Sequence, residues 1–127
     1  MPARRRKSGG GPGENVSAIR RDWLERLIEQ LAQVLARALG HRASGAESLA
    51  LEEIHRATGD LFGIPRAMLL SLDARAALEI LDQPRLREAA LRLLDEEESI
   101  LRGQGKVADA DALAAWLART RAAAAAG

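Results

Sequence analysis

The chain has 127 residues and a formal net charge of +1, and 47% of its residues are hydrophobic, 29% charged and 2% aromatic. This length provides for one modest core and leaves no room for a second domain. The absence of cysteine excludes a disulfide framework, a thiolate nucleophile and a cysteine-ligated metal. With so few aromatic residues the core must consist of Leu, Ala and Ile, which favours helices because alanine is the best helix former and is depleted in strands.

Positive charge is concentrated at the N-terminus, in Arg4, Arg5, Arg6 and Lys7. The Ser, Gly and Pro residues that follow at 8–13 have the composition of a flexible linker. We therefore predict a disordered basic arm and linker over residues 1–15 and a single helical domain over residues 16–127. The arm can attract phosphates, but it has no interleaved aromatic residue on which bases would stack. A solvated tail is the simpler interpretation, and weak nucleic-acid binding is the alternative.

The first predicted helix covers residues 18–39. Apolar residues recur in it at three- and four-residue steps and form one amphipathic stripe, which consists of Leu24, Leu27, Ile28, Leu31, Leu35, Ala38 and Leu39. Ser17 is placed to cap its N-terminus, and Gly40 is placed to end it. A second helix is predicted over residues 46–58, and Gly59 is expected to end it.

Shorter helices and a helical hairpin follow. Pro65 fits the first position of a short helix over residues 66–70, and Ser71 is expected to cap another over residues 72–81. Two longer helices are predicted over residues 84–102 and 106–125, with a break at Gly-Gln-Gly. Such an αα-hairpin usually stacks on other helices. The predicted fold is therefore an all-α, compact bundle of five to six helices built on αα-hairpins.

Four consecutive acidic residues lie in one turn of the penultimate helix: Asp95, Glu96, Glu97 and Glu98. Consecutive residues cannot all share one face of a helix. We therefore favour a solvated face over paired catalytic or metal-binding carboxylates.

His41 and His55 are the only histidines, and their separation by 14 positions matches no metal-ligand motif. A metal site would need them to converge with Glu52 or Asp60, so a loop histidine and a helix-surface histidine are the favoured interpretation. No nucleophile elbow or phosphate-binding loop is present. We expect no catalytic residue, no metal and no cofactor.

The two tryptophans are candidate protein-interaction residues, because tryptophan is a frequent interface anchor. Trp23 is expected in the core or at its edge, since a chain so poor in aromatics needs bulk in its interior. Trp116 shares only part of the apolar face that Val107 and Leu113 mark on the last helix. Trp116 is therefore the best candidate for an exposed contact, with Leu113 beside it and Trp23 as a further candidate.

The order of these segments resembles a bacterial family of small, uncharacterised, all-helical proteins. The resemblance covers residues 22–121 and rests on DWLERLIEQL at 22–31, a shorter helix, Leu-Ser-Leu at 70–72 and the Gly-Gln-Gly turn at 103–105. It implies a fold and no known activity.

The C-terminal hairpin separately resembles a tetratricopeptide repeat, with Gly105 at the turn, Ala110 at the small position of the second helix and Leu117 further along. It departs from that repeat at Glu98, where a small residue is usual, and at Leu101, which replaces the usual aromatic residue. One hairpin is fewer than the roughly three repeats of a self-standing array. We therefore expect the first hairpin, over residues 18–58, to pack as its neighbour in a compact bundle.

The sequence predicts a non-catalytic protein–protein interaction module. A groove between the helix pairs, or the face with Trp116 and Leu113, would take a partner helix or a second copy in a homodimer. The alternative is a nucleic-acid accessory protein that uses Arg4, Arg5, Arg6 and Lys7. No apolar run reaches the roughly 20 residues of a membrane-spanning helix, so we expect no membrane contact and a cytoplasmic location.

Overall fold

A computed structural model describes residues 12–127 of the chain, with side chains described from residue 18 onward. It contains five α-helices and one 3₁₀ helix, η2, and no strand among the described residues. The elements are α1 (Pro12–Ala43), α2 (Glu47–Phe62), η2 (Arg66–Ser71), α3 (Ala74–Ile80), α4 (Pro84–Gly103) and α5 (Val107–Ala126). The predicted all-α bundle of five to six helices is confirmed.

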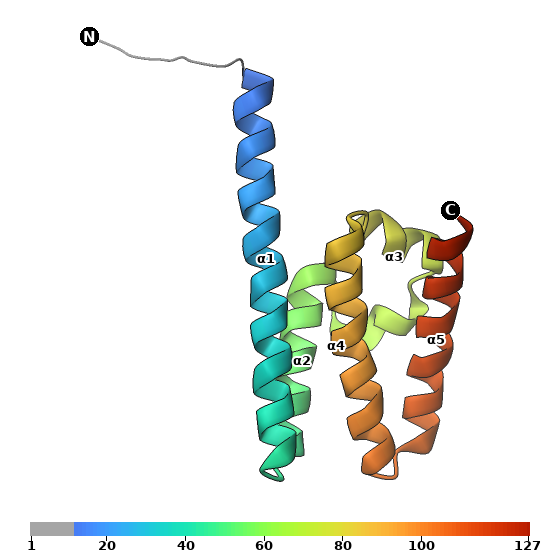
Figure 1. The fold of residues 1–127 in the computed structure, drawn as a ribbon. Helices are drawn as coiled ribbons and strands as arrows, with labels where there is room; N and C mark the ends of the chain where they lie inside the picture. Colours follow the sequence, from blue (N-terminus) through green and yellow to red (C-terminus); the bar gives the residue numbers. More distant parts are fainter. Residues whose placement is uncertain (1–11) are drawn as a thin grey trace.

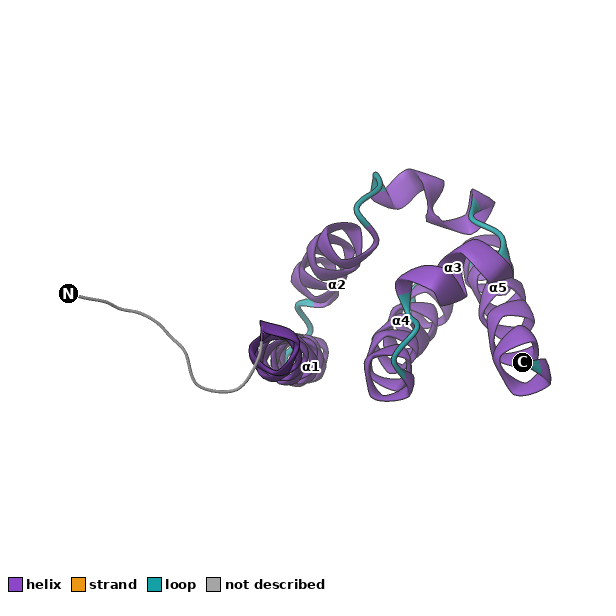
Figure 2. Cartoon of the chain, turned by 90° about the horizontal axis from the view of Figure 1, so that it is seen from above, coloured by secondary structure: helices purple, strands orange, loops and turns teal. Residues whose placement is uncertain are grey.

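The bundle is built from two antiparallel helix pairs (Figure 1). In one pair α2 runs back along α1, and in the other α5 runs back along α4. The pairs meet where α4 packs against both α1 and α2. Seen from above, η2 and α3 form the connection between α2 and the second pair and lie against α5 (Figure 2).

The core receives residues from all six elements and consists mainly of leucine and alanine, as the composition predicts. Alanines contribute at the closest points, because a methyl side chain lets two helix backbones approach. Ala38, Ala50, Ala90 and Ala110 have no exposed surface. Phe62 and Trp116 are the aromatic residues of this core.

The first helix extends further at both ends than the sequence predicts. It begins at Pro12, inside the predicted linker, and it ends at Ala43. Gly40 is an interior helical residue with negative φ, and the positive φ that ends the segment belongs to Gly45, at 83°. A cross-helix contact holds the additional turn, since Arg42 donates a hydrogen bond to Glu96 of α4 at 3.0 Å.

Two other predicted ends also need correction. Gly59 lies within α2, and the helix ends at Gly63, which adopts the left-handed conformation with φ 68°. Ser71 does not cap α3: its hydroxyl donates to the Met68 carbonyl within η2. The cap is Asp73, whose carboxylate accepts a hydrogen bond from the backbone N–H of Ala76 at 2.8 Å.

The C-terminal hairpin forms as the glycines predict. Pro84 is at the first position of α4, where its missing N–H costs nothing. Gly105 takes φ 79° in the turn. There the backbone N–H of Lys106 donates to the carbonyl of Leu101 at 2.9 Å, one of the hydrogen bonds that close the last turn of α4.

Replacing Gly63 or Gly40 by alanine is expected to change stability in opposite directions. At Gly63 a Cβ in the left-handed region costs about 1–2 kcal/mol. At Gly40 nothing lies within 4 Å of an added Cβ, and alanine in a helix interior is favoured over glycine by about 0.5–1 kcal/mol. Chemical denaturation should show a lower unfolding free energy for Gly63→Ala and a higher one for Gly40→Ala. A gain for both would contradict the assigned helix ends.

Candidate functional site

The N-terminal part of α1 projects beyond the rest of the bundle (Figure 1). The 32 residues of α1 and the 16 of α2 correspond to lengths of about 48 and 24 Å. On the other side, Glu25 pairs with Arg85, the second residue of α4. Residues of α1 before Glu25 therefore lie past the start of α4 and past the end of α2. Leu24 still packs against the core, so we call residues 12–23 the α1 overhang.

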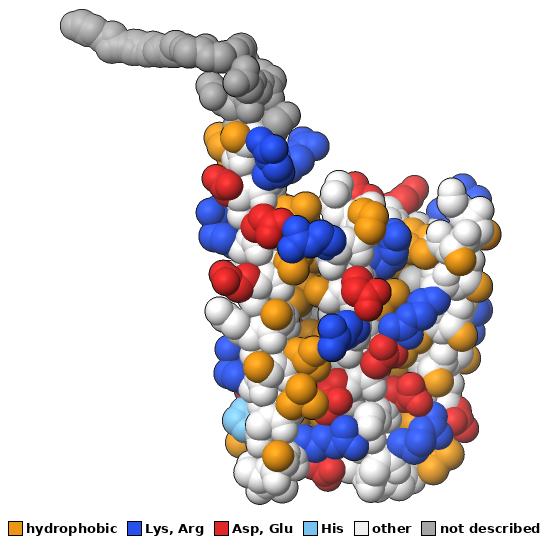
Figure 3. All heavy atoms as spheres, in the orientation of Figure 1, with side chains coloured by type: hydrophobic (Ala, Val, Ile, Leu, Met, Phe, Trp, Pro, Cys, Tyr) orange, Lys and Arg blue, Asp and Glu red, His pale blue; other side chains and the backbone are white. Residues whose placement is uncertain are grey.

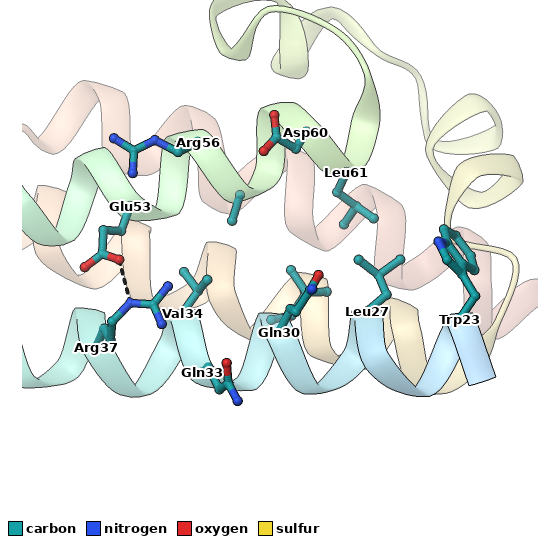
Figure 4. A pocket seen from close by; sticks show the side chains of 12 residues that line it. Trp23, Leu27, Gln30, Gln33, Val34, Arg37, Glu53, Arg56, Asp60 and Leu61 are labelled. Carbon is teal, nitrogen blue, oxygen red and sulfur yellow. Dashed lines mark hydrogen bonds and ion pairs between the residues drawn. The ribbon is translucent and has the colours of Figure 1, made fainter. Parts of the chain in front are cut away.

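The overhang exposes two large apolar side chains on one side of the helix. Ile19 is 67% exposed and Trp23 is 55% exposed. They are four residues apart, which makes them neighbours on a helix surface. Trp23 continues the face on which Leu27 packs toward Leu61 of α2, so the apolar face of α1 runs on where α2 has ended (Figure 4).

A groove between α1 and α2 lies beside Trp23. It has a volume of about 380 Å³, and its apolar lining includes Leu27, Val34, Ala57 and Leu61. Figure 4 shows Trp23 at one end of this α1–α2 groove and the Arg37–Glu53 ion pair toward the other. Gln30 and Asp60 lie between these two ends, so the groove is apolar near Trp23 and more polar toward the ion pair.

The ion pair in the groove is a three-residue cluster. The Nε of Arg37 donates to Glu53 at 2.7 Å, and the Nε2 of His41 lies 2.6 Å from the other carboxylate oxygen. The hydrogen bond from Arg37, with the contact to His41, holds the pKa of Glu53 below its ordinary value. Glu53 is therefore charged at neutral pH, and its two carboxylate oxygens already contact Arg37 and His41.

A second cavity, of about 720 Å³, lies between the overhang and the turn before α4. We call it the overhang notch. Its lining residues on α1 are Ile19, Arg20, Arg21, Trp23, Leu24 and Arg26, and Asp82 and Gln83 line it from the turn. Trp23 lines both the notch and the α1–α2 groove, so it stands where the two cavities meet.

Three arginines give this region a positive rim. Within residues 18–127, Arg20, Arg21 and Arg26 form no ion pair, and the same holds for Arg56, Arg75, Arg87, Arg92 and Arg119. The three arginines of α1 are distinguished by lining one cavity together. Figure 3 shows blue and orange side chains together on the part of α1 that leaves the bundle, next to the grey atoms, with a red side chain just below them. Apolar and positive groups are therefore combined on one exposed surface.

The predicted exposure of Trp116 is wrong, since its side chain is 1% exposed. Leu113 faces inward as predicted and is also 1% exposed, so the face with Trp116 and Leu113 is not available to a partner. The indole N–H of Trp116 donates to the Leu72 carbonyl at 2.8 Å, and its ring meets Phe62 edge to face at a centroid distance of 6.2 Å. Val107, which the prediction placed inward, is 50% exposed. The apolar face of α5 is thus rotated toward Trp116, and η2 and α3 cover it.

Trp23 also lies elsewhere than expected, since it is exposed and not in the core. The sequence pattern placed it inward because it follows Ile19 and precedes Leu27 at helical steps. That pattern gives the direction of a side chain but not the length of the neighbouring helix. Because α2 ends at Phe62, more than half of the surface of Trp23 stays exposed in the described chain.

The solvated-face interpretation of the acidic turn is wrong for Glu97, which is 4% exposed. The four acids point to different segments: Asp95 pairs with Arg121, Glu96 with Arg42, Glu97 with Arg66 and His55, and Glu98 with Arg102. Burial of Glu97 acts to raise its pKa, but the hydrogen bonds from His55 and Arg66 outweigh that and hold the pKa below its ordinary value. The turn therefore joins helices.

The histidines do not converge on a metal site. His55 lies 3.2 Å from Glu97 and His41 contacts Glu53, instead of Glu52 or Asp60. Among the described residues, no three His, Cys, Asp or Glu side chains are placed to hold a metal ion. Nor is any helix of residues 12–127 both long enough and apolar enough to cross a membrane.

The candidate basic arm, Arg4, Arg5, Arg6 and Lys7, lies outside the described residues. The resemblances of residues 22–121 to a bacterial family, and of the α4–α5 hairpin to a tetratricopeptide repeat, stay predictions. None of the protein-family models, curated proteins or solved structures compared with the chain matches it.

Proposed function

We propose that the chain is a non-catalytic helical module that binds another protein through the α1 overhang and the two cavities beside it. The observation that supports this most is Trp23, which is 55% exposed and lines both cavities. Tryptophan is among the residues that contribute most to binding energy at interfaces, especially when a partner encloses it in a pocket. A neighbouring exposed Ile19 enlarges the apolar contact.

The surface combines the two features of a specific interface. Burial of Ile19, Trp23 and the groove lining would provide affinity, because apolar area removed from water stabilises a complex. Arg20 and Arg26 at the rim would set the orientation of the partner and accelerate its approach, which is the main contribution of exposed charges to binding.

Site-specific photo-cross-linking in the cell of origin tests this proposal. A photoreactive amino acid at Asp22, which is exposed and beside Trp23, should yield a protein adduct whose captured chain is identified by mass spectrometry. The same group at Arg119, exposed on α5, should not. Adding Trp23→Ala should reduce the Asp22 adduct by about 30-fold, the effect of an interface anchor that contributes about 2 kcal/mol.

The fold of Trp23→Ala serves as the control. Because its side chain lies outside the core, the variant should keep the thermal midpoint and circular dichroism of the original chain. Equal adducts from Asp22 and Arg119 would overturn the proposal. An adduct that nuclease treatment removes would instead support nucleic-acid binding through the basic arm.

A further inference from the structure

The shape of the overhang fits one more helix. The residues of α1 that α2 and α4 leave uncovered, about 12 in number, span roughly 18 Å, or about three helical turns. Beyond the overhang, Leu27 and Val34 of α1 face Ala57 and Leu61 of α2 across the groove that these residues line. A partner helix that continues the line of α2 would extend the same packing to Trp23 and Ile19. Such a helix needs apolar residues at steps of three and four along one face.

The charges that line the overhang notch indicate which charges the polar face of the partner helix should carry. Arg20, Arg21 and Arg26 line the notch together with a single acid, Asp82. None of the three arginines has a carboxylate partner within residues 18–127. Glu25, on the same helix, forms its ion pair with Arg85 of α4 instead. A helix with carboxylates beside its apolar stripe would supply the missing partners, and a basic helix would be repelled.

A second copy of the chain fits this surface less well. A two-fold contact places the same patch on both subunits. If two overhangs crossed antiparallel at Trp23, Arg20 of one copy would face Arg26 of the other, since the two arginines lie three positions before and after the tryptophan. Like charges would then oppose each other at the centre of the contact.

Nucleic acid is also negatively charged, but it offers no apolar surface to the apolar side chains of the overhang notch. Ile19, Trp23 and Leu24 line the notch together with the arginines. Phosphates would satisfy the arginines and leave these side chains in water, because a duplex presents its charged backbone and keeps its bases stacked inside.

We propose that the partner presents an acidic amphipathic helix, whose apolar face packs on Ile19, Trp23 and Leu27 while its carboxylates pair with Arg20 and Arg26. This inference rests on the proposed function, because it names the chemistry of the partner for the same surface. It predicts that charge, and not only hydrophobicity, decides what binds.

Tryptophan fluorescence of the full chain provides the test. Trp116 is buried and Trp23 exposed, so acrylamide quenching reports mainly on Trp23. The probe is a capped peptide of about 15 residues, close to the minimum for helix formation, with leucine on one face and glutamate on the other. It should shift the emission to shorter wavelength, protect Trp23 from acrylamide, and bind at least about tenfold more tightly than the same peptide with lysine in place of glutamate.

A charge-reversed variant gives the decisive comparison. Arg20→Glu/Arg26→Glu should invert the preference, so that the lysine peptide binds more tightly. The matched control is Arg92→Glu/Arg119→Glu, which changes the net charge equally at two exposed arginines on α4 and α5. This control should retain the preference of the original chain, and both variants should keep its circular dichroism.

Several results would overturn the inference. These are equal binding of the two peptides, inversion by the control pair as well, displacement of the acidic peptide by duplex DNA, and dimerisation of the protein alone with Trp23 shielded. If the acidic peptide fails to bind while the photoreactive group at Asp22 still captures a protein, this inference is wrong and the proposed function stands. If both fail, both are wrong.

Discussion

Replacing Trp116 by alanine is expected to lower the free energy of unfolding by about 3–5 kcal/mol, the range for a large aromatic residue removed from a core. The side chain is 1% exposed and packs against Phe62. Its loss leaves a cavity between α5 and η2 and an unpaired Leu72 carbonyl. Since a small domain has about 5–15 kcal/mol of stability in total, urea unfolding should show a large decrease in the midpoint.

Trp116→Phe should have an intermediate effect. It keeps an aromatic ring against Phe62, but it removes the indole N–H that donates to Leu72 and part of the ring volume. A lost hydrogen bond that leaves a buried partner unpaired costs about 1–3 kcal/mol, so this variant should lie between the original chain and Trp116→Ala. An alanine variant as stable as the original chain would mean that Trp116 is exposed, as the sequence suggests.

Replacing Glu97 by alanine is expected to cost about 3–5 kcal/mol, the range for breaking a buried ion pair by removing one partner. Arg66 would lose its carboxylate, and His55 would lose the same contact. The arrangement is already only partly satisfied, because Arg66 Nε and Glu97 Oε1 are buried without a hydrogen-bond partner in the described chain. An unpaired guanidinium there has little access to water, so its desolvation is not offset.

The double variant Glu97→Leu/Arg66→Met is the control for Glu97→Ala. Replacing a buried ion pair by apolar residues of similar volume is often neutral or stabilising. The double variant should therefore regain most of the stability that Glu97→Ala loses, as measured by urea unfolding at neutral pH. A double variant that is as unstable as the single one would show that the loss comes from packing and not from charge.

The pH dependence of the Glu97 contribution has a defined sign. The folded-state pKa of Glu97 lies below its ordinary value of 4.5, so the folded state favours the charged form more than the unfolded chain does. Its contribution is complete above pH 4.5 and is lost as the pH falls through the folded-state pKa. The difference in unfolding free energy between the original chain and Glu97→Gln should therefore be largest at neutral pH and shrink in acid.

The helical hairpin at the C-terminus was predictable because its signals are local. Pro84 begins α4, and the glycines at 103 and 105 mark the turn, so the residue types alone determine where these helices begin and end. Gly40 and Gly59 show where this reasoning fails. Both are interior helical residues, because contacts with other helices continue the segment past them.

The candidate site was not predictable because it depends on relative helix lengths. Trp23 is exposed because α2 ends at Phe62, and Trp116 is buried because η2 and α3 cover α5. The segment that covers Trp116, η2 with α3, consists of short helices with weak hydrophobic periodicity, so no pattern in the sequence shows where this segment packs. Helical periodicity gives the direction of each side chain, and the tertiary fold decides whether anything lies there.

The acidic turn of α4 connects segments from both halves of the chain. Residues 95–98 contact Arg42 of α1, His55 of α2, Arg66 of η2 and Arg121 of α5. A fragment with only the first hairpin would leave Arg42 and His55 without their acids, and a fragment with only the second would leave Glu96 and Glu97 without their bases. We therefore expect the bundle to unfold as one cooperative unit, and a chain cut between α2 and α4 to yield no half that folds alone.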